Sequence, residues 1–253
     1  QLIISMLSSK VNYNIQNNVN EFIGQIIDLY SSEKFEEVVF YINKYLEKHP
    51  PSHQLYNILG ITYNKLNNNT LACDCYFKAI NIEPNFAVSY FNLGSLFHEQ
   101  NSFENAIENY KKAISLNPNY IDAIFNLANV LKDNGQDKKA INVYRSLLKK
   151  DYNHIDTHYN LGVIFKEINR LSSSIFHFEV VLKIKSTYLD TFFNLGTLYQ
   201  KIKKFEKAIY YYSQECKTNE NNYMAYYLMG NAYIEKCDYK AAYQNFQKSL
   251  QIS

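Results

Sequence analysis

The clearest pattern of apolar and polar residues lies between Ala87 and Tyr120. Four residues share one helical face at about 100° per residue: Tyr90, Leu93, Gly94 and Phe97. A second set follows with the same periodicity: Phe103, Ala106, Tyr110 and Ala113. Asn101, between the two sets, can take the left-handed backbone conformation that ends a helix. The pattern predicts a helix-turn-helix hairpin that needs neighbours to bury its apolar faces.

The same pattern recurs at intervals of 34 residues. With Ala87 as position 1, position 8 is small in six units: Gly60, Gly94, Ala128, Gly162, Gly196 and Gly230. Position 20 is also small: Ala72, Ala106, Ala140, Ser174, Ala208 and Ala242. Position 24 is aromatic: Tyr76, Tyr110, Tyr144, Phe178, Tyr212 and Phe246. Small residues let two helices cross closely, and we expect the aromatic ring to fill the gap to the next hairpin.

This register resembles the tetratricopeptide repeat, with an aromatic residue at position 4, Leu-Gly at 7 and 8, Ala at 20, an aromatic at 24 and Pro at 32. The resemblance extends from Val19 to Ser253. It implies an all-α fold, a right-handed solenoid of antiparallel helix hairpins. It implies little about chemistry, because this family supplies binding scaffolds for many pathways.

The repeats predict how the chain is divided. Residues 1–18 are an N-terminal segment that could end a preceding helix, and 19–52 form a degenerate repeat with Ile26 at position 8. Six clear repeats follow: 53–86, 87–120, 121–154, 155–188, 189–222 and 223–253. The last repeat is incomplete, so we expect Tyr243, Phe246 and Leu250 to be partly uncovered. Either the parent protein continues, or two copies associate end to end.

Composition limits the classes of partner that we expect and the cellular compartment of the protein. The formal net charge of +2 gives no field that would recruit a polyanion, so we expect no nucleic-acid binding. Cys73, Cys75, Cys216 and Cys237 lack the spacing of metal ligands and are typical of reduced thiols in an intracellular protein, cytoplasmic or nuclear. The sequence has no apolar run of the roughly 20 residues that a membrane span needs, so we expect no membrane insertion.

Candidate binding residues lie on the first helix of each hairpin, which we expect to line a concave groove. Position 6 carries a row of amides: Asn92, Asn126, Asn160 and Asn194. Position 2 carries a row of carboxylates: Asp122, Asp156 and Asp190. An amide both donates and accepts, so the row could hold the backbone of an extended peptide. Alternatively, the Asn residues bridge adjacent hairpins and the Asp residues favour the positive helix ends.

Position 5 carries a row of aromatic residues: Phe91, Phe125, Tyr159, Phe193 and Tyr227. If the row faces the groove, it forms an apolar floor that marks a partner site. The alternative is core packing against a neighbouring hairpin. Together the rows predict a scaffold or adaptor that binds a protein or peptide ligand in the concave groove.

The Asn and Asp rows are also similar to those of the repeat region of nucleocytoplasmic O-linked N-acetylglucosamine transferases, where such rows hold acceptor polypeptides. That resemblance implies an alternative function, as the acceptor-binding region of such an enzyme without its catalytic domain. Repeats that clamp the C-terminal carboxylate of heat-shock chaperones use Lys at position 5, where this chain has aromatic residues. We therefore do not expect that class of partner.

The sequence shows no catalytic motif. The six histidines are scattered, and no Ser or Cys stands in a motif with one of them. His154 and His158 flank Asp156 at one-turn spacing, but His158 occupies the core position 4. No Gly-rich phosphate loop occurs among the seven glycines. We expect no catalytic residue, no metal and no cofactor.

Overall fold

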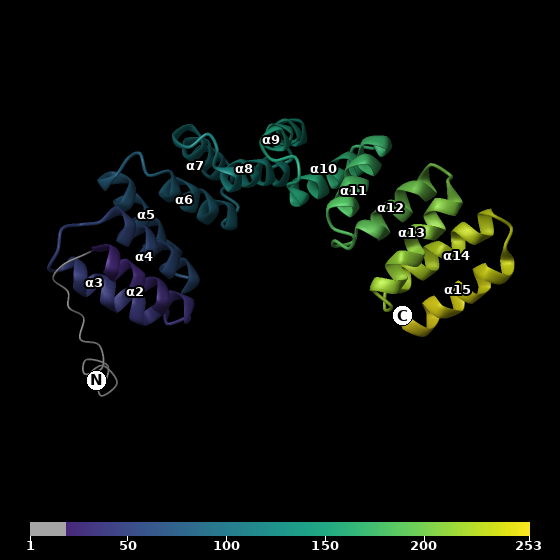
Figure 1. The fold of residues 1–253 in the computed structure, drawn as a ribbon, viewed down its shortest axis with the longest axis horizontal. Coiled ribbons are helices and arrows are strands. Elements are labelled where there is room, and N and C mark those ends of the chain that lie inside the picture. Colours follow the sequence, from purple (N-terminus) through teal and green to yellow (C-terminus); the bar gives the residue numbers. More distant parts are fainter. Residues whose placement is uncertain (1–18) are drawn as a thin grey trace. The chain divides into compact units, whose positions relative to one another are not determined.

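The computed structural model describes residues 19–253, and over this range helices joined by short turns are the only regular secondary structure, without strands (Figure 1). The predicted all-α class is therefore confirmed, and the chain is a helical-repeat solenoid. The predicted N-terminal segment, residues 1–18, lies outside the described residues.

The helices fall into two compact units, and the chain passes from the first to the second between Asn134 and Gly135. The first contains α2 (Val19–Ser31), α3 (Phe35–Leu46), α4 (His53–Lys65), α5 (Asn69–Ile82), α6 (Ala87–Glu99), α7 (Phe103–Leu116) and α8 (Ile121–Asp133). The second contains α9 (Asp137–Lys150), α10 (Ile155–Glu167), α11 (Leu171–Ile184), α12 (Thr191–Lys201), α13 (Phe205–Thr218), α14 (Tyr223–Glu235) and α15 (Tyr239–Ile252).

The turn inside each hairpin has one residue with positive φ, always at position 15. Asn101 has φ of 57°, as predicted, and Gly135 has φ of 68°. The other residues with this conformation at position 15 are Glu33, Asn67, Asn169, Lys203 and Cys237. A left-handed residue reverses the chain directly after the first helix, so the second helix can pack back against it.

The small residue at position 8 lies beneath the aromatic ring at position 24. A Cβ added to Gly94 would come within 3.0 Å of the Tyr110 ring, and one added to Gly60 within 2.4 Å of the Tyr76 ring. Each ring thus belongs to the same hairpin as the glycine it covers. That the same ring also fills the gap to the next hairpin stays a prediction, and the Tyr144 hydroxyl does accept a hydrogen bond from Asn160 of the next hairpin.

One helix begins later than its repeat predicts. α12 starts at Thr191, while Leu189 has φ of 41°, which is not helical, and Asp190 is the N-cap residue. The other two predicted acidic residues, Asp122 and Asp156, lie in the first turns of α8 and α10. Asp190 therefore stands outside the helix, and its carboxylate is not in the register expected for the row.

Each unit has its own core. In the second unit the core is formed by a group of buried residues: Phe178, Leu195, Leu198, Tyr199, Ala208, Tyr212, Cys216, Ala225 and Met229. At the last helix, Tyr243 is 63% and Leu250 77% exposed, as expected, and Phe246 is half-buried. An end-to-end contact between copies at this face stays a prediction.

Candidate functional site

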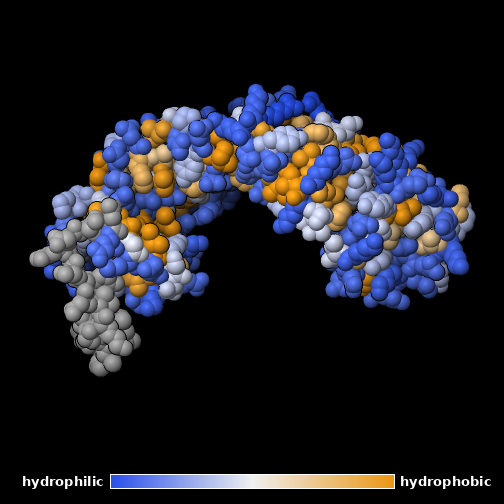
Figure 2. Space-filling model, in the orientation of Figure 1, coloured by the Kyte–Doolittle hydropathy of each residue, from blue (hydrophilic) through white to orange (hydrophobic). Residues whose placement is uncertain are grey.

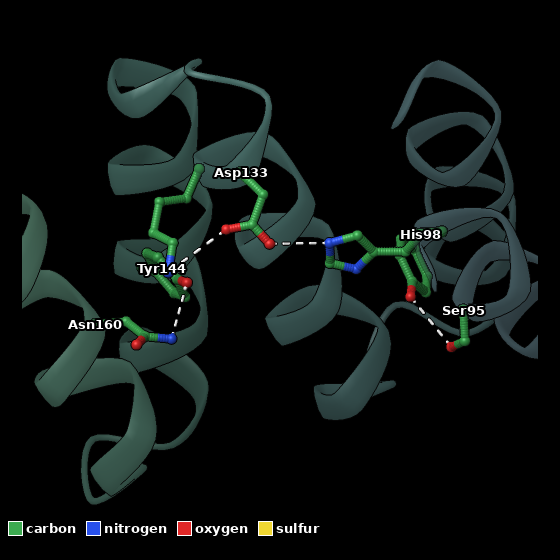
Figure 3. Close-up of polar contacts among 7 residues, drawn as sticks. Ser95, His98, Asp133, Tyr144 and Asn160 are labelled. Atoms are coloured by element: carbon green, nitrogen blue, oxygen red, sulfur yellow. Dashed lines mark hydrogen bonds and ion pairs between the residues drawn. The ribbon is translucent and has the colours of Figure 1, made fainter. Parts of the chain in front are cut away.

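Two of the four amides at position 6 contact the tyrosine at position 24 of the preceding hairpin. Asn160 Nδ2 donates to the Tyr144 hydroxyl oxygen at 3.1 Å, and Figure 3 shows the two side chains pointing at one another. Asn126 makes the same kind of contact to Tyr110, whose own hydroxyl donates to Ser95 Oγ at 3.1 Å. Two members of the row therefore link successive hairpins.

The other two amides have different partners for a chemical reason. Position 24 before Asn194 is Phe178, which has no hydroxyl, and Asn194 Oδ1 instead accepts a hydrogen bond from Lys166 Nζ at 2.7 Å. Asn92 Nδ2 donates to Asn57 Oδ1 at 3.0 Å. Asn194 is buried, at 8% exposure, whereas Asn92 is half-buried. The row bridges hairpins along its length.

The acidic residues at position 2 stay at the surface. Asp122, Asp156 and Asp190 are all exposed. Asp156 accepts a hydrogen bond from the hydroxyl of Tyr188. Burial, together with that carboxylate, raises the pKa of Tyr188 to about 12. These carboxylates remain reachable by a cationic ligand.

Four of the aromatic residues at position 5 pack against the ring at position 24 of their own hairpin. Ring centroids are 5.6 Å apart for Tyr159 and Phe178, 6.1 Å for Phe193 and Tyr212, and 5.7 Å for Tyr227 and Phe246. In the first unit, Phe91 contacts Tyr110 at 5.9 Å and Tyr120 at 4.9 Å. Phe91, Phe125, Tyr159 and Phe193 are half-buried, and Tyr227 is 47% exposed. The row is thus neither fully core nor fully surface.

A set of polar contacts at positions 12 and 13 escaped the sequence analysis. His98 Nε2 donates to Asp133 Oδ2 at 3.0 Å, as Figure 3 shows. Asn64 Nδ2 donates to Glu99 Oε2 at 3.0 Å in the same register. Both pairs are 35 residues apart in the sequence, one more than the repeat, and that spacing is the signal that could have revealed them.

Two histidines form a pair in the second unit. His158 Nε2 faces the Tyr152 carbonyl at 2.9 Å and donates to it, so His158 Nδ1 accepts from His177 Nδ1 at 2.9 Å. Burial is the main cause that lowers the pKa of His177 to about 4, and the nearby His158 and Arg145 lower it further. Burial also lowers the pKa of His158. Both rings are neutral at neutral pH.

Neither the histidines nor the cysteines form a metal site in the described part of the chain. No group of three His, Cys, Asp or Glu residues converges there. Cys73, Cys75, Cys216 and Cys237 are free thiols. Burial raises the pKa of Cys75 to about 11 and that of Cys216 to about 11, so these two are protonated and unreactive.

The helices from residue 19 onward include none with both the length and the apolar character that a membrane crossing requires.

Comparison with known families identifies the class of protein. Models described as tetratricopeptide repeats match residues 53–86, 123–155, 189–222 and 224–253, and a model described as a TPR repeat matches 94–135. The chain belongs to the tetratricopeptide repeat family. Proteins with this fold are in general protein–protein interaction scaffolds without catalytic activity. No curated protein sequence matches the chain significantly.

Solved structures show the same fold at low sequence identity. PilF of Pseudomonas aeruginosa is 16% identical, with a TM-score of 0.69, over 79% of this chain and 91% of that protein. A crystal structure of the MamA protein is 24% identical, with a TM-score of 0.62, over 66% of this chain and 91% of that one. YrrB, described as a TPR protein with an unusual peptide-binding site, is 16% identical, with a TM-score of 0.52, over 84% of this chain and 92% of that one.

Proposed function

We propose that this protein is a non-catalytic scaffold that binds a polypeptide segment along the first helices of its hairpins. The segment lies across the aromatic row at position 5, between the acidic side chains of position 2 and the last turns of the same helices. Each unit carries its own stretch of these rows.

The accessible aromatic row of the second unit is the observation that carries the proposal. Tyr159, Phe193 and Tyr227 each rest on a ring of their own hairpin, yet none is fully buried. By contrast, the leucines at position 7, such as Leu161 and Leu195, are completely buried. Aromatic rings that are fixed on one side and open on the other offer apolar contact area at little entropic cost.

The amide row contributes in a second way. Asn92, Asn126 and Asn160 are half-buried, so each is within reach of a ligand while it holds two hairpins together. Asn194 is almost closed to solvent and serves the link to Lys166. A ligand that bound these amides would therefore contact the protein at the junctions between successive hairpins.

The fold neighbours support a peptide ligand in general terms. YrrB is a TPR protein with an unusual peptide-binding site, and at 16% identity its likeness to this chain extends to the fold alone. The acceptor-binding region of an O-linked glycosyltransferase is the alternative. It depends on the same Asn and Asp rows, and it adds a catalytic domain outside the residues described here.

The test uses peptides selected from a random library on the purified protein. Binding of the selected peptides is then measured by fluorescence anisotropy for Phe193→Ala and Tyr227→Ala. We expect each variant to weaken binding about tenfold or more, since a buried aromatic anchor contributes at least that much.

Tyr210→Ala is the matched control. Tyr210 is 56% exposed and lies on the second helix α13, away from the row. The Tyr210→Ala variant should bind the selected peptides as the wild type does. If Tyr210→Ala lost as much affinity as Tyr227→Ala, or if the Tyr227→Ala variant bound normally while circular dichroism showed an intact fold, the proposal would be wrong.

A further inference from the structure

We propose that α9 and α11 of the second unit form a second interaction surface, on the second helices of the hairpins, which binds acidic polypeptide segments. We call it the basic outer face and define it by five cations: Lys138, Arg145, Lys149, Arg170 and Lys183. It shares no residue with the aromatic row on the first helices and does not depend on the function proposed for that row.

The concentration of charge on α9 is the first observation. This helix carries five cations, Lys138, Lys139, Arg145, Lys149 and Lys150, against the single carboxylate of Asp137. Lys138, Arg145 and Lys149 are separated by seven and four residues, so they lie on one face of the helix. All three are exposed, and Figure 2 shows strongly hydrophilic surface where Figure 1 places α9.

The neighbouring elements extend the charge. Arg170, at the N-cap of α11, and Lys183, in the last turn of α11, are both exposed. No carboxylate of the described residues lies within ion-pair distance of Lys138, Lys149, Arg170 or Lys183. Arg145 is held 5.9 Å from the centre of the Phe165 ring, which fixes its guanidinium in place without neutralising it.

Two recesses give this surface a shape. One, of about 780 Å³, is lined by Lys138, Arg145, Arg170, Ile141 and Ile168, among others. The other, of about 490 Å³, is lined by Tyr152, Asn153, Phe176, Val180, Lys183 and Ile184. The larger recess combines several cations with apolar side chains, and the smaller one combines the single cation Lys183 with apolar side chains. Each recess is large enough for side chains of a partner.

Exposed apolar residues between the cations define the partner further. Tyr152 is 57% and Phe176 52% exposed, next to Lys183 in the smaller recess. A ligand that contacts both the cations and the exposed apolar residues must carry carboxylates that alternate with bulky apolar side chains. An acidic polypeptide segment with Phe or Leu between Asp and Glu residues has that chemistry.

The surface suits a protein segment better than a nucleic acid. Asp137 is the first residue of α9, Asp151 is its C-cap residue, and Glu179 lies on α11. A continuous row of phosphates would meet repulsion from these carboxylates. The net charge of the whole chain, +2, supplies no long-range attraction for a polyanion. A peptide can place its carboxylates only where the cations are.

Fluorescence anisotropy with a labelled synthetic peptide tests the proposal on the whole chain. The probe is rich in Glu and Asp and contains Phe and Leu, and the comparison peptide has Gln and Asn in place of the acids. We expect saturable binding of the acidic probe only, weakened by added salt. Lys149→Glu combined with Lys183→Glu should reduce the affinity about tenfold or more.

The control variant combines Lys240→Glu with Lys248→Glu, two exposed lysines of α15, and changes the net charge by the same amount. It should bind as the wild type does, and Tyr227→Ala should as well. The proposal would be overturned if the control variant lost as much affinity as the test variant, or if the acidic probe did not bind. It would also be overturned if a single-stranded oligonucleotide or phosphatidylserine vesicles bound more tightly than the acidic probe. Circular dichroism of each variant confirms that its helices are intact.

Discussion

The ring of Tyr212 lies directly on Gly196, so that a Cβ added to this glycine would come within 2.5 Å of the ring. The same relationship links Gly230 with Phe246. It sets the distance between the two helices of a hairpin, because the ring fits only where the opposite helix has no side chain.

Gly196→Ala should therefore destabilise the protein by about 1–3 kcal/mol, since the Tyr212 ring is fully buried and cannot move aside. Urea unfolding followed by circular dichroism measures the change. Gly24→Ala is the control, because nothing lies within 4 Å of the added Cβ in the helix α2. That variant should gain up to about 1 kcal/mol from the better helix propensity. Destabilisation of both variants to the same extent would contradict the packing argument.

Lys203→Gly should stabilise the protein. Lys203 has φ of 58°, a conformation that costs a residue with a Cβ about 1 kcal/mol relative to glycine. The reverse change, Gly135→Ala, removes glycine from the equivalent turn, where φ is 68°, and should destabilise by a similar amount. Melting temperatures that moved in the same direction for both variants would show that the turn conformation does not limit stability.

The histidine pair predicts acid sensitivity of the second unit. The pKa of His177 is about 4, below its ordinary value of 6.5, so between these pH values the unfolded chain binds more protons than the folded one. Stability is then full above pH 6.5, falls as the pH drops toward 4 and levels off below it, with a loss of up to about 3 kcal/mol. The groups facing His177 are His158, which would repel the new charge, and Arg145, which would do the same.

His177→Phe keeps a ring that can stack on Phe165, where the histidine now lies with an interplanar angle of 13°. Melting curves between pH 4 and pH 7 should show a smaller loss for this variant than for the wild type. A pH profile of the variant parallel to that of the wild type would mean that other groups cause the acid sensitivity.

Tyr144→Phe should cost about 0.5–1.5 kcal/mol, because it removes the hydroxyl that accepts from Asn160 at 3.1 Å. Tyr227→Phe, at an exposed tyrosine, should change the free energy of unfolding by less than about 0.5 kcal/mol. Chemical denaturation separates the two cases. A neutral Tyr144→Phe variant would show that the amide row does not hold successive hairpins together.

Part of the candidate site followed from the sequence, and part of it did not. The residues at positions 2, 5 and 6 were identified from spacing alone, but the spacing left two alternatives for each row. The structure shows that the amides contact preceding hairpins and that the aromatic rings rest on their own. Binding at these rows stays a prediction.

The sequence by itself determined the helical-repeat fold, the 34-residue register and the turn at Asn101, because these depend on local backbone geometry repeated along the chain. Only the tertiary structure decided that Tyr110 covers Gly94, that His177 meets His158 and that α12 begins at Thr191. Those contacts depend on side-chain rotamers and on the offset between packed helices. Neither quantity is encoded in the spacing of residues along one helix.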